Sequence, residues 1–399
     1  MLQPALNGVR VLEVGNFMAA PFCAMQLADL GADVIKVENP DGGDLVRATG
    51  PFIGGESSNF VRLNRNKRSL ALDLKTLPGR EVFRQLARTA DIVVENLRPG
   101  TMADLELDYP HLAELNPRLI YVAASGWGQD GPYAHLPGLD LIAQGMSGLM
   151  SITGEEGGAS PVKVGVPLTD LTCALYAALA AMCALRARDR DGRGQFIDVC
   201  LFEAGVSLAV WEAGLYWATG QVPCALGSAH QNVAPYQAFR ASDGFFTVGV
   251  SSDRTWASFC SALGLERLRD DPRFAANHLR HQNRRELIPL IEEVTVRQNA
   301  SVWVERLRAA GVPCGVLQTY DRVFDDPHLN ARGFFTGAPH PTVGMVRQIG
   351  SPMRMSATPP RIDRAGPLLG EHSIEVLEEI GYPTEEIRRL AEAGVIGTP

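Results

Sequence analysis

Short apolar strands alternate with helices along roughly the first half of the 399-residue chain. We expect strands at residues 9–14, 33–38, 69–74, 92–95, 119–124 and 196–199, and helices at 20–30 and 79–89. This βαβ rhythm is typical of a parallel sheet flanked by helices, with ligands at the carboxyl ends of the strands. The sequence therefore predicts an open, Rossmann-like α/β domain.

The pattern changes near residue 225. A strand is expected at 245–250 and helices at 254–263, 284–297 and 300–310, which indicates a smaller α+β domain over residues 225–325. The large domain would take residues 1–224, including a long apolar helix at 201–219. Residues 326–399 would return to that domain through strand-like segments at 339–361 and a helix at 371–393.

Composition excludes several classes of protein. The chain is 46% hydrophobic and 21% charged, and its net charge of −8 does not suit nucleic acid or an anionic membrane. No apolar run approaches the ~20 residues of a membrane span. The first residues, Met1–Pro4, show neither the basic nor the apolar region of a secretory signal. We therefore expect a cytoplasmic protein.

Several site classes lack their motifs. The seven cysteines contain no Cys-x-x-Cys pair, which indicates buried free thiols in a reducing compartment, and the eight histidines show no metal-ligand spacing. No Gly-x-Gly-x-x-Gly follows the first strand and no P-loop is present. Ser125 lacks the upstream glycine of a nucleophile elbow. Dehydrogenase, kinase and hydrolase functions are therefore disfavoured, and no metal site is predicted.

Asp170 stands where a loop meets a helix expected at residues 171–186. One interpretation is an N-cap, because Asp before an apolar helix satisfies an unpaired backbone N–H. The other is a covalent nucleophile, since the helix dipole would keep the carboxylate ionised at neutral pH and able to attack an acyl group. The two are compatible because a carboxylate has two oxygens.

A set of motifs in fixed order identifies a resemblance. The chain carries Gly8–Glu13, Ala20–Phe22, Leu27–Glu38, Gly43–Asp44, Asn64–Ser69, Leu72–Lys75, Glu95–Gly100, Ser125–Pro132 and Gly192–Gln195. Together they resemble the class III CoA-transferases, the CaiB/BaiF-type family, almost from end to end. The resemblance implies a homodimer in which two ring-shaped subunits interlock, each with a large α/β domain and a smaller domain.

The resemblance also implies a reaction. The family nucleophile corresponds to Asp170, which would form a mixed aspartyl anhydride with the donor acyl group and then an aspartyl-CoA thioester. Acyl-CoA and a small carboxylic acid would be the substrates, with no permanently bound cofactor. The segment Asn16, Phe17, Met18 and Ala19 matches the family segment that lies along CoA and offers backbone N–H groups to the oxyanion. Alternatively, Phe17 and Met18 are core residues, and many relatives carry a polar side chain where Met18 stands.

Further positions match contacts with the nucleotide end of CoA. Leu72 and Lys75 form one such group, and Asn96, Leu97 and Arg98 form another. Asn39 and Asp104 stand where some members place basic residues. The adjacent Lys67 and Arg68 would compensate for these changes or would lie on a solvated surface.

The acceptor acid is indicated by resemblance to members that use succinyl-CoA and small dicarboxylic acids, strongest over residues 227–239. Arg47, Asp140 and His230 are candidates for contact with its carboxylates, and a structural ion pair is the alternative for Arg47. Related racemases carry an acid/base histidine where this chain has Leu139, which favours a transferase. We predict CoA transfer from succinyl-CoA to itaconate, mesaconate, malate, citramalate or a glutarate. The alternatives are other acids (oxalate or formate, carnitine-like or aromatic), a racemase, or a CoA-binding protein without catalysis.

Overall fold

A computed structural model describes residues 3–399. The chain forms two compact units, each with its own hydrophobic core. The first unit consists of three stretches, Met1–Leu149, Val164–Gly214 and Pro327–Pro399. The second consists of Met150–Lys163 and Leu215–Asp326.

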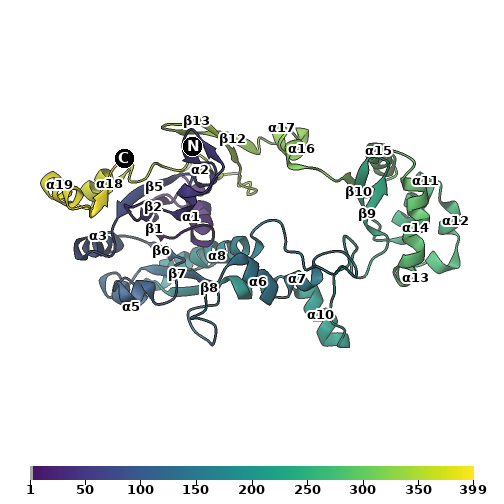
Figure 1. Ribbon diagram of the computed structural model, residues 1–399, viewed down its shortest axis with the longest axis horizontal. Helices are drawn as coiled ribbons and strands as arrows, with labels where there is room; N and C mark the ends of the chain where they lie inside the picture. The colour runs from purple at the N-terminus through teal and green to yellow at the C-terminus, as the bar shows by residue number, and fades with distance from the viewer. Residues whose placement is uncertain (1–2) are drawn as a thin grey trace. The chain divides into compact units, whose positions relative to one another are not determined.

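A seven-stranded sheet forms the centre of the first unit, in the order β14-β5-β2-β1-β6-β7-β8 (Figure 1). Its strands are β1 (Arg10–Val14), β2 (Asp33–Glu38), β5 (Lys67–Leu72), β6 (Ile92–Glu95), β7 (Ile120–Ser125), β8 (Phe196–Cys200) and β14 (Ile396–Gly397). All neighbours pair in parallel except β14, which runs antiparallel to β5. The predicted parallel α/β sheet is confirmed, although the strand expected at 69–74 begins two residues earlier.

Two helical layers cover this sheet, because successive residues of a strand point to opposite faces. Val11 packs on one face in a core with α1 (Ala19–Asp29) and α8 (Leu168–Asp191). Leu12 and Val14 pack on the other face. That second core is shared by α3 (Leu77–Ala87), α5 (Tyr109–Leu115), α18 (Ser373–Glu379) and α19 (Thr384–Glu392) (Figure 1).

Helix α8 is longer and more apolar than the sequence suggested. It has 24 residues and is the one described helix long and apolar enough, by length and composition, to cross a membrane. Core helices pass the same test, and here Ala174, Ala177 and Ala181 are fully buried in the core beneath the sheet. Alanine allows the close approach of α1 and α8, so packing accounts for the apolar residues on this face of the helix, whereas Leu175 and Leu179 are exposed.

Shorter elements complete the first unit. They are η1 (Leu45–Ala48), β3 (Phe52–Ile53), β4 (Glu56–Ser57), α2 (Phe60–Leu63), α4 (Thr101–Asp104), α6 (Asp140–Met146), α9 (Leu201–Ser207), α17 (Pro327–Ala331), β12 (Phe335–His340) and β13 (Gly344–Ile349). Two expected helices are each divided. The one at 201–219 becomes α9 and α10 (Val210–Thr219), with no Gly or Pro at the break. The one at 371–393 becomes α18 and α19, separated by Gly381 at a φ of 87° and by Pro383.

The second unit has an antiparallel sheet, β11-β10-β9, with strands β9 (Tyr236–Ala241), β10 (Gly244–Gly249) and β11 (Cys314–Val316). Phe239 and Phe246 of this sheet are fully buried against Phe259 and other helical residues. Residues of α11 (Asp253–Leu263), α12 (Glu266–Arg269), η2 (Pro272–Phe274), α14 (Arg284–Thr295) and α15 (Ala300–Ala309) share the core of this unit. Further helices are α7 (Leu149–Ile152), α13 (Asn277–Gln282) and α16 (Tyr320–Phe324).

Candidate active site

A cavity of about 690 Å³ opens at the carboxyl edge of the parallel sheet of the first unit. Its walls come from the segments that follow β1, β6 and β7, together with the first turns of α6 and α8. Strands β2 and β5 lie on one side of β1, whereas β6, β7 and β8 lie on its other side. The strand order thus reverses between β1 and β6, which is where open α/β sheets bind ligands.

The loops after β1 and β6 are tied together across this reversal. The backbone N–H of Asn16 donates to Asn96 Oδ1 (2.9 Å), and Asn96 Nδ2 donates to the carbonyl of Asn16 (2.8 Å). Gly15 is required beside this pair, since a Cβ there would lie 2.8 Å from both Ala20 Cβ and Asn96 Oδ1. Asn16 and Asn96, which the resemblance assigns to different parts of CoA, are thus in direct contact.

Asp170 lines the cavity from the first turn of α8. The N-cap interpretation is wrong, because the helix begins at Leu168 and its N-cap is Pro167. Asp170 is therefore the third helical residue, and no hydrogen bond of its carboxylate appears among the described residues. Its carboxylate is available to a ligand in the cavity.

Asp140, the first residue of α6, performs the capping role instead. Its Oδ1 accepts hydrogen bonds from the N–H of Thr169 (3.0 Å) and from Thr169 Oγ1 (2.8 Å), and its Oδ2 accepts one from Gln144 Nε2 (2.8 Å). A carboxylate from a different helix thus satisfies one N–H of the α8 N-terminus. This leaves Asp140 committed to structure while its charge remains next to Asp170.

The environment opposes ionisation of Asp170. Burial raises its pKa to about 7, and the negative charge of Asp140 acts in the same direction. Both effects act against the helix dipole, which was expected to keep this group ionised at neutral pH. The carboxylate is poised near neutrality, where a nucleophile is both available and reactive.

Phe17, Met18 and Ala19 line the same cavity. Phe17 is not a core residue, because half of its surface is exposed and its backbone is left-handed (φ 59°). Such a conformation costs a bulky residue about 1–2 kcal/mol. The N–H groups of Asn16 and Phe17 are already bonded, the latter to Asp44 Oδ1 (3.2 Å). Among the described residues, those of Met18 and Ala19 have no acceptor, as expected before and at the start of a helix.

The residues predicted to contact the nucleotide end of CoA lie at the same sheet edge. Leu97 and Arg98 line the cavity beside Asn96, and Arg98 is the one Lys or Arg among the described residues that do so. Lys75 and Asn39 are exposed in the turns after β5 and β2, outside the lining. Leu72 is 1% exposed in the core, so any contact it makes with a ligand has to come from its backbone.

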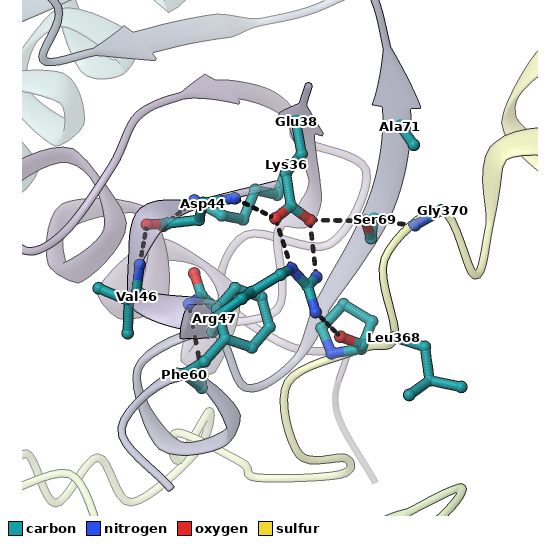
Figure 2. A network of polar contacts seen from close by, with 12 residues as sticks. Lys36, Glu38, Asp44, Val46, Arg47, Phe60, Ser69, Ala71, Leu368 and Gly370 are labelled. Carbon is teal, nitrogen blue, oxygen red and sulfur yellow. Dashed lines mark hydrogen bonds and ion pairs between the residues drawn. The ribbon is translucent and has the colours of Figure 1, made fainter. Parts of the chain in front are cut away.

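Arg47 forms the structural ion pair that the sequence left as the alternative (Figure 2). Its Nε and Nη2 donate to the two oxygens of Glu38, each at 2.8 Å, and Nη1 donates to the carbonyl of Pro367 (3.1 Å). The guanidinium also lies 3.6 Å from the centre of the Phe60 ring. A substrate carboxylate would have to displace Glu38 from this fork, which corrects the assignment of Arg47 to the acceptor.

Two other predicted features are not part of the cavity lining. His230 belongs to the second unit, where its Nδ1 accepts from the N–H of Asn232 (3.0 Å) and its ring packs on Tyr236. Lys67 and Arg68 are buried rather than solvated. Lys67 pairs with Glu13 (2.6 Å), and Arg68 pairs with Asp33 (2.6 Å). Neither is available to a phosphate. In residues 3–399, no group of three or more His, Cys, Asp or Glu side chains has the geometry of a metal site.

Sequence reasoning missed the buried charges beneath the cavity. Lys36 is fully buried and contacts Glu13 Oε1 (2.6 Å), Asp44 Oδ2 (2.9 Å) and the carbonyl of Gly15 (2.9 Å). Charged residues inside otherwise apolar strands were the available signal, since Glu13 and Lys36 interrupt hydrophobic runs in β1 and β2.

Comparison with known proteins gives a consistent result. Residues 6–373 match the family model described as CoA-transferase family III. The succinate–glutarate CoA-transferase of Agrobacterium fabrum (strain C58) is 39% identical over 98% of this chain and 98% of that protein. The acetyl-CoA:oxalate CoA-transferase of Acetobacter aceti is 35% identical over 94% of this chain and 96% of that protein. A CaiB/BaiF family protein from Brucella suis has a crystal structure with a TM-score of 0.86 at 38% identity, covering 95% of this chain and 100% of that one.

Replacing Arg47 with Met should destabilise the protein by about 3–5 kcal/mol, because Glu38 would remain buried without its partner. Burial opposes ionisation of Glu38, but hydrogen bonds from Arg47 hold its pKa below the ordinary value. The free energy of unfolding from urea denaturation measures the loss. Arg62→Met is the matched control, since Arg62 Nη1 contacts only Ser58. Normal stability with selectively weakened binding of dicarboxylic acids would restore Arg47 to the acceptor site.

Proposed function

The chain belongs to CoA-transferase family III, and on this basis we propose that it moves CoA from succinyl-CoA to a small dicarboxylic acid. The observation that carries the proposal is Asp170, a carboxylate at the ligand-binding edge of the sheet with no hydrogen-bond partner among residues 3–399. A capping residue would be bonded to the helix, whereas this carboxylate faces the same cavity as unpaired backbone amides.

The proposed reaction proceeds through acyl groups on Asp170. One oxygen of its carboxylate attacks the thioester carbonyl, the C–S bond breaks, and CoA leaves as a thiolate from the mixed anhydride. The thiolate then attacks the aspartyl carbonyl, which releases the first acid and leaves an aspartyl-CoA thioester. The acceptor carboxylate attacks this thioester and expels the thiolate, which finally attacks the acceptor's acyl carbon and frees Asp170.

This sequence conserves the energy of the thioester. Each step exchanges one acyl link for another, so the covalent route replaces one difficult exchange by several of similar energy. CoA and its esters are substrates in this scheme, and no permanently bound cofactor takes part.

We assign stabilisation of the oxyanions to the N–H groups of Met18 and Ala19. The amides of Asn16 and Phe17 already donate to Asn96 and Asp44. Of the four residues predicted from the sequence, Met18 and Ala19 are therefore the ones whose amides can bind the oxyanion. Met18 contributes through its backbone, since a thioether cannot donate a hydrogen bond. Amide donors of this kind are typically worth about 10²–10³-fold in rate each.

CoA would extend from this point along the carboxyl edge of the sheet. Asn96, Leu97 and Arg98 follow β6, while Asn39, Leu72 and Lys75 stand at the ends of β2 and β5 on the other side of β1. Arg98 and Lys75 are the cations in this set and are our candidates for contact with the phosphates.

Small dicarboxylates are the proposed acceptors, with glutarate first because a relative named for it is 39% identical. Mesaconate and citramalate come next, since relatives named for them are 38% and 36% identical. Oxalate is the alternative, because a relative named for that acid is 35% identical. Each of these acids carries a second carboxylate, for which the described lining of the cavity offers no cation beyond Arg98, already assigned to CoA. Asp140 is unsuited to contact this carboxylate, because it is itself a carboxylate and is bonded to the N-terminus of α8. His230, in the second unit, stays a prediction. A racemase is disfavoured, because Leu139 lines the cavity where an acid/base group is needed, and its hydrocarbon side chain can neither donate nor accept a proton.

We also propose an interlocked homodimer in the cytoplasm. Large apolar side chains are exposed on α8 and α10, where Leu175, Leu179, Trp211 and Trp217 are between 52% and 82% exposed. Large exposed apolar side chains of this kind are typical of an interaction site, and a second copy of the chain is the proposed occupant. All seven cysteines are unpaired, which supports a reducing compartment.

Transfer activity and the role of Asp170 are tested together. Incubation with succinyl-CoA and a panel of dicarboxylic acids, followed by chromatography of the CoA esters, should yield a new ester, with the highest kcat/KM for glutarate. Mass spectrometry after hydroxylamine treatment should show modification of the peptide that contains Asp170. Asp170→Ala should lower kcat by about 10⁴-fold or more.

Asp170→Asn separates loss of chemistry from loss of structure. Because burial disfavours the charged carboxylate, this neutral variant should keep or raise the melting temperature above pH 7 while remaining inactive. Wild-type exchange rates in either variant would refute the nucleophile. A wild-type protein that binds CoA but forms no ester and no adduct would be a binder rather than an enzyme.

The pH dependence follows from the raised pKa of Asp170. The nucleophile works only when deprotonated, so kcat/KM should rise with pH to a plateau, with a midpoint near the pKa of about 7. Asp140→Asn removes a neighbouring negative charge and keeps Oδ1 as an acceptor for Thr169. It should therefore shift this midpoint to lower pH, whereas Asp130→Asn, on the surface, should leave it in place. An unmoved midpoint in Asp140→Asn would exclude coupling of the two carboxylates.

Interlocking makes a specific prediction about dissociation, because linked rings cannot separate without unfolding. Light scattering should give twice the chain's 43.1 kDa even at nanomolar concentrations. Tagged and untagged copies, mixed after purification, should not exchange subunits without denaturant. Exchange within minutes would indicate an ordinary dimer, and a monomeric mass would refute the assembly.

A further inference from the structure

We propose that Asp44 is a positioning residue for the oxyanion site: its carboxylate holds Phe17 in the left-handed conformation that presents the amides of Met18 and Ala19 to the thioester. The inference rests on the proposed function and adds a residue to it. Asp44 does not line the cavity, so it would act through the backbone of the turn after β1.

The turn needs an external restraint. Phe17 has a φ of 59°, which bulky side chains rarely adopt, and its half-exposed ring is not held by packing. Two side chains restrain the backbone at this point through three hydrogen bonds. Asn96 holds the N–H and carbonyl of Asn16, and Asp44 Oδ1 accepts from the N–H of Phe17 (3.2 Å). Without the hydrogen bond to Asp44, Phe17 would be free to relax to negative φ, and the amides of Met18 and Ala19 would change orientation.

Asp44 is itself held rigidly. It is 1% exposed, and its Oδ1 also accepts from the N–H of Val46 (3.0 Å), while its own N–H donates to Glu38 Oε1 (3.0 Å). Glu38 in turn binds Arg47 and Ser69, and Ser69 Oγ accepts from the N–H of Gly370 (Figure 2). The loop after β2 is thereby fastened to β5 and to the segment before α18.

Lys36 links both ends of the turn. Its Nζ contacts Asp44 Oδ2 (2.9 Å) and donates to the carbonyl of Gly15 (2.9 Å), the residue at which the turn begins. One buried ammonium therefore fixes the start of the turn directly and its apex through Asp44. The negative charge of Asp44 matters here, because a neutral amide would lose the attraction to Lys36 and loosen the acceptor of Phe17 N–H.

The chemical consequence concerns the transition state more than substrate binding. Charge develops on the thioester oxygen only as Asp170 attacks, so amides fixed in advance lower the barrier without tightening the ground state. Loss of Asp44 should therefore reduce kcat and leave the KM for succinyl-CoA nearly unchanged.

The test compares Asp44→Asn with Asp29→Asn. Asp29 is equally buried and pairs with Arg65 (2.6 Å), but it lies at the C-terminal end of α1, towards the opposite edge of the sheet from the cavity. Both variants lose a buried ion pair, so both should lower the melting temperature. Only Asp44→Asn should lower kcat, by about 10- to 100-fold, with KM within threefold of wild type. Asp29→Asn should keep kcat within twofold.

Equal kcat values for the two variants, measured well below both melting temperatures, would overturn the positioning role. If Asp44→Asn does not fold, Asp44→Glu replaces it, because glutamate keeps the charge for Lys36 but displaces the oxygen from Phe17 N–H. The same kcat loss is expected there, and wild-type kcat would again refute the proposal. If the proposed function itself is wrong, the wild-type protein will show no CoA transfer, and this result is distinguishable from an effect of the Asp44 variants.

Discussion

The structure depends on a buried ion network that crosses three adjacent strands. Glu13 of β1 pairs with Lys36 of β2 and Lys67 of β5, and all three side chains are fully buried. Removing one partner from such a group leaves an uncompensated charge in a low-dielectric interior, at a cost of about 3–5 kcal/mol. Apolar residues would hold the sheet equally well. The charged groups also fix the position of the backbone, because each ammonium donates a hydrogen bond to a carbonyl. Lys36 binds the carbonyl of Gly15, and Lys67 binds that of Pro21.

Those carbonyls flank the segment that enters the cavity. The network therefore fixes the turn between β1 and α1 from below, and Asn96 fixes it from β6. On the far wall, Asp140 caps α8 and so releases Asp170 from that task. On both walls, buried side chains satisfy the structural hydrogen bonds. The carboxylate of Asp170 and the amides of Met18 and Ala19 therefore have no partner in the part of the chain that the structure describes.

Local sequence pattern was sufficient for the sheet, because strands buried on both faces read as short apolar runs, and 33–38 and 92–95 agree residue for residue. It failed where a partner distant in the chain decides the outcome. Asp170 has the local appearance of a cap, but residue 140 takes that role. Lys67 and Arg68 have the local appearance of a surface pair, but they meet Glu13 and Asp33. The guanidinium of Arg47 can bind any carboxylate, and in the fold it binds Glu38 and is therefore not free for a ligand. Asp170 and the segment 16–19 were located by resemblance, and their unpaired state required the fold.

The pKa of Asp170 connects reactivity with protection of the proposed intermediate. Burial raises it to about 7, so the carboxylate is weakly hydrated. A poorly hydrated carboxylate is the stronger nucleophile, and a site that excludes water also preserves a mixed anhydride from hydrolysis. Trp127, Leu136 and Leu139 supply apolar wall on this side of the cavity, where a polar wall would retain water. The same wall would favour the thiolate over water as the next nucleophile, and that preference separates a transferase from a thioesterase.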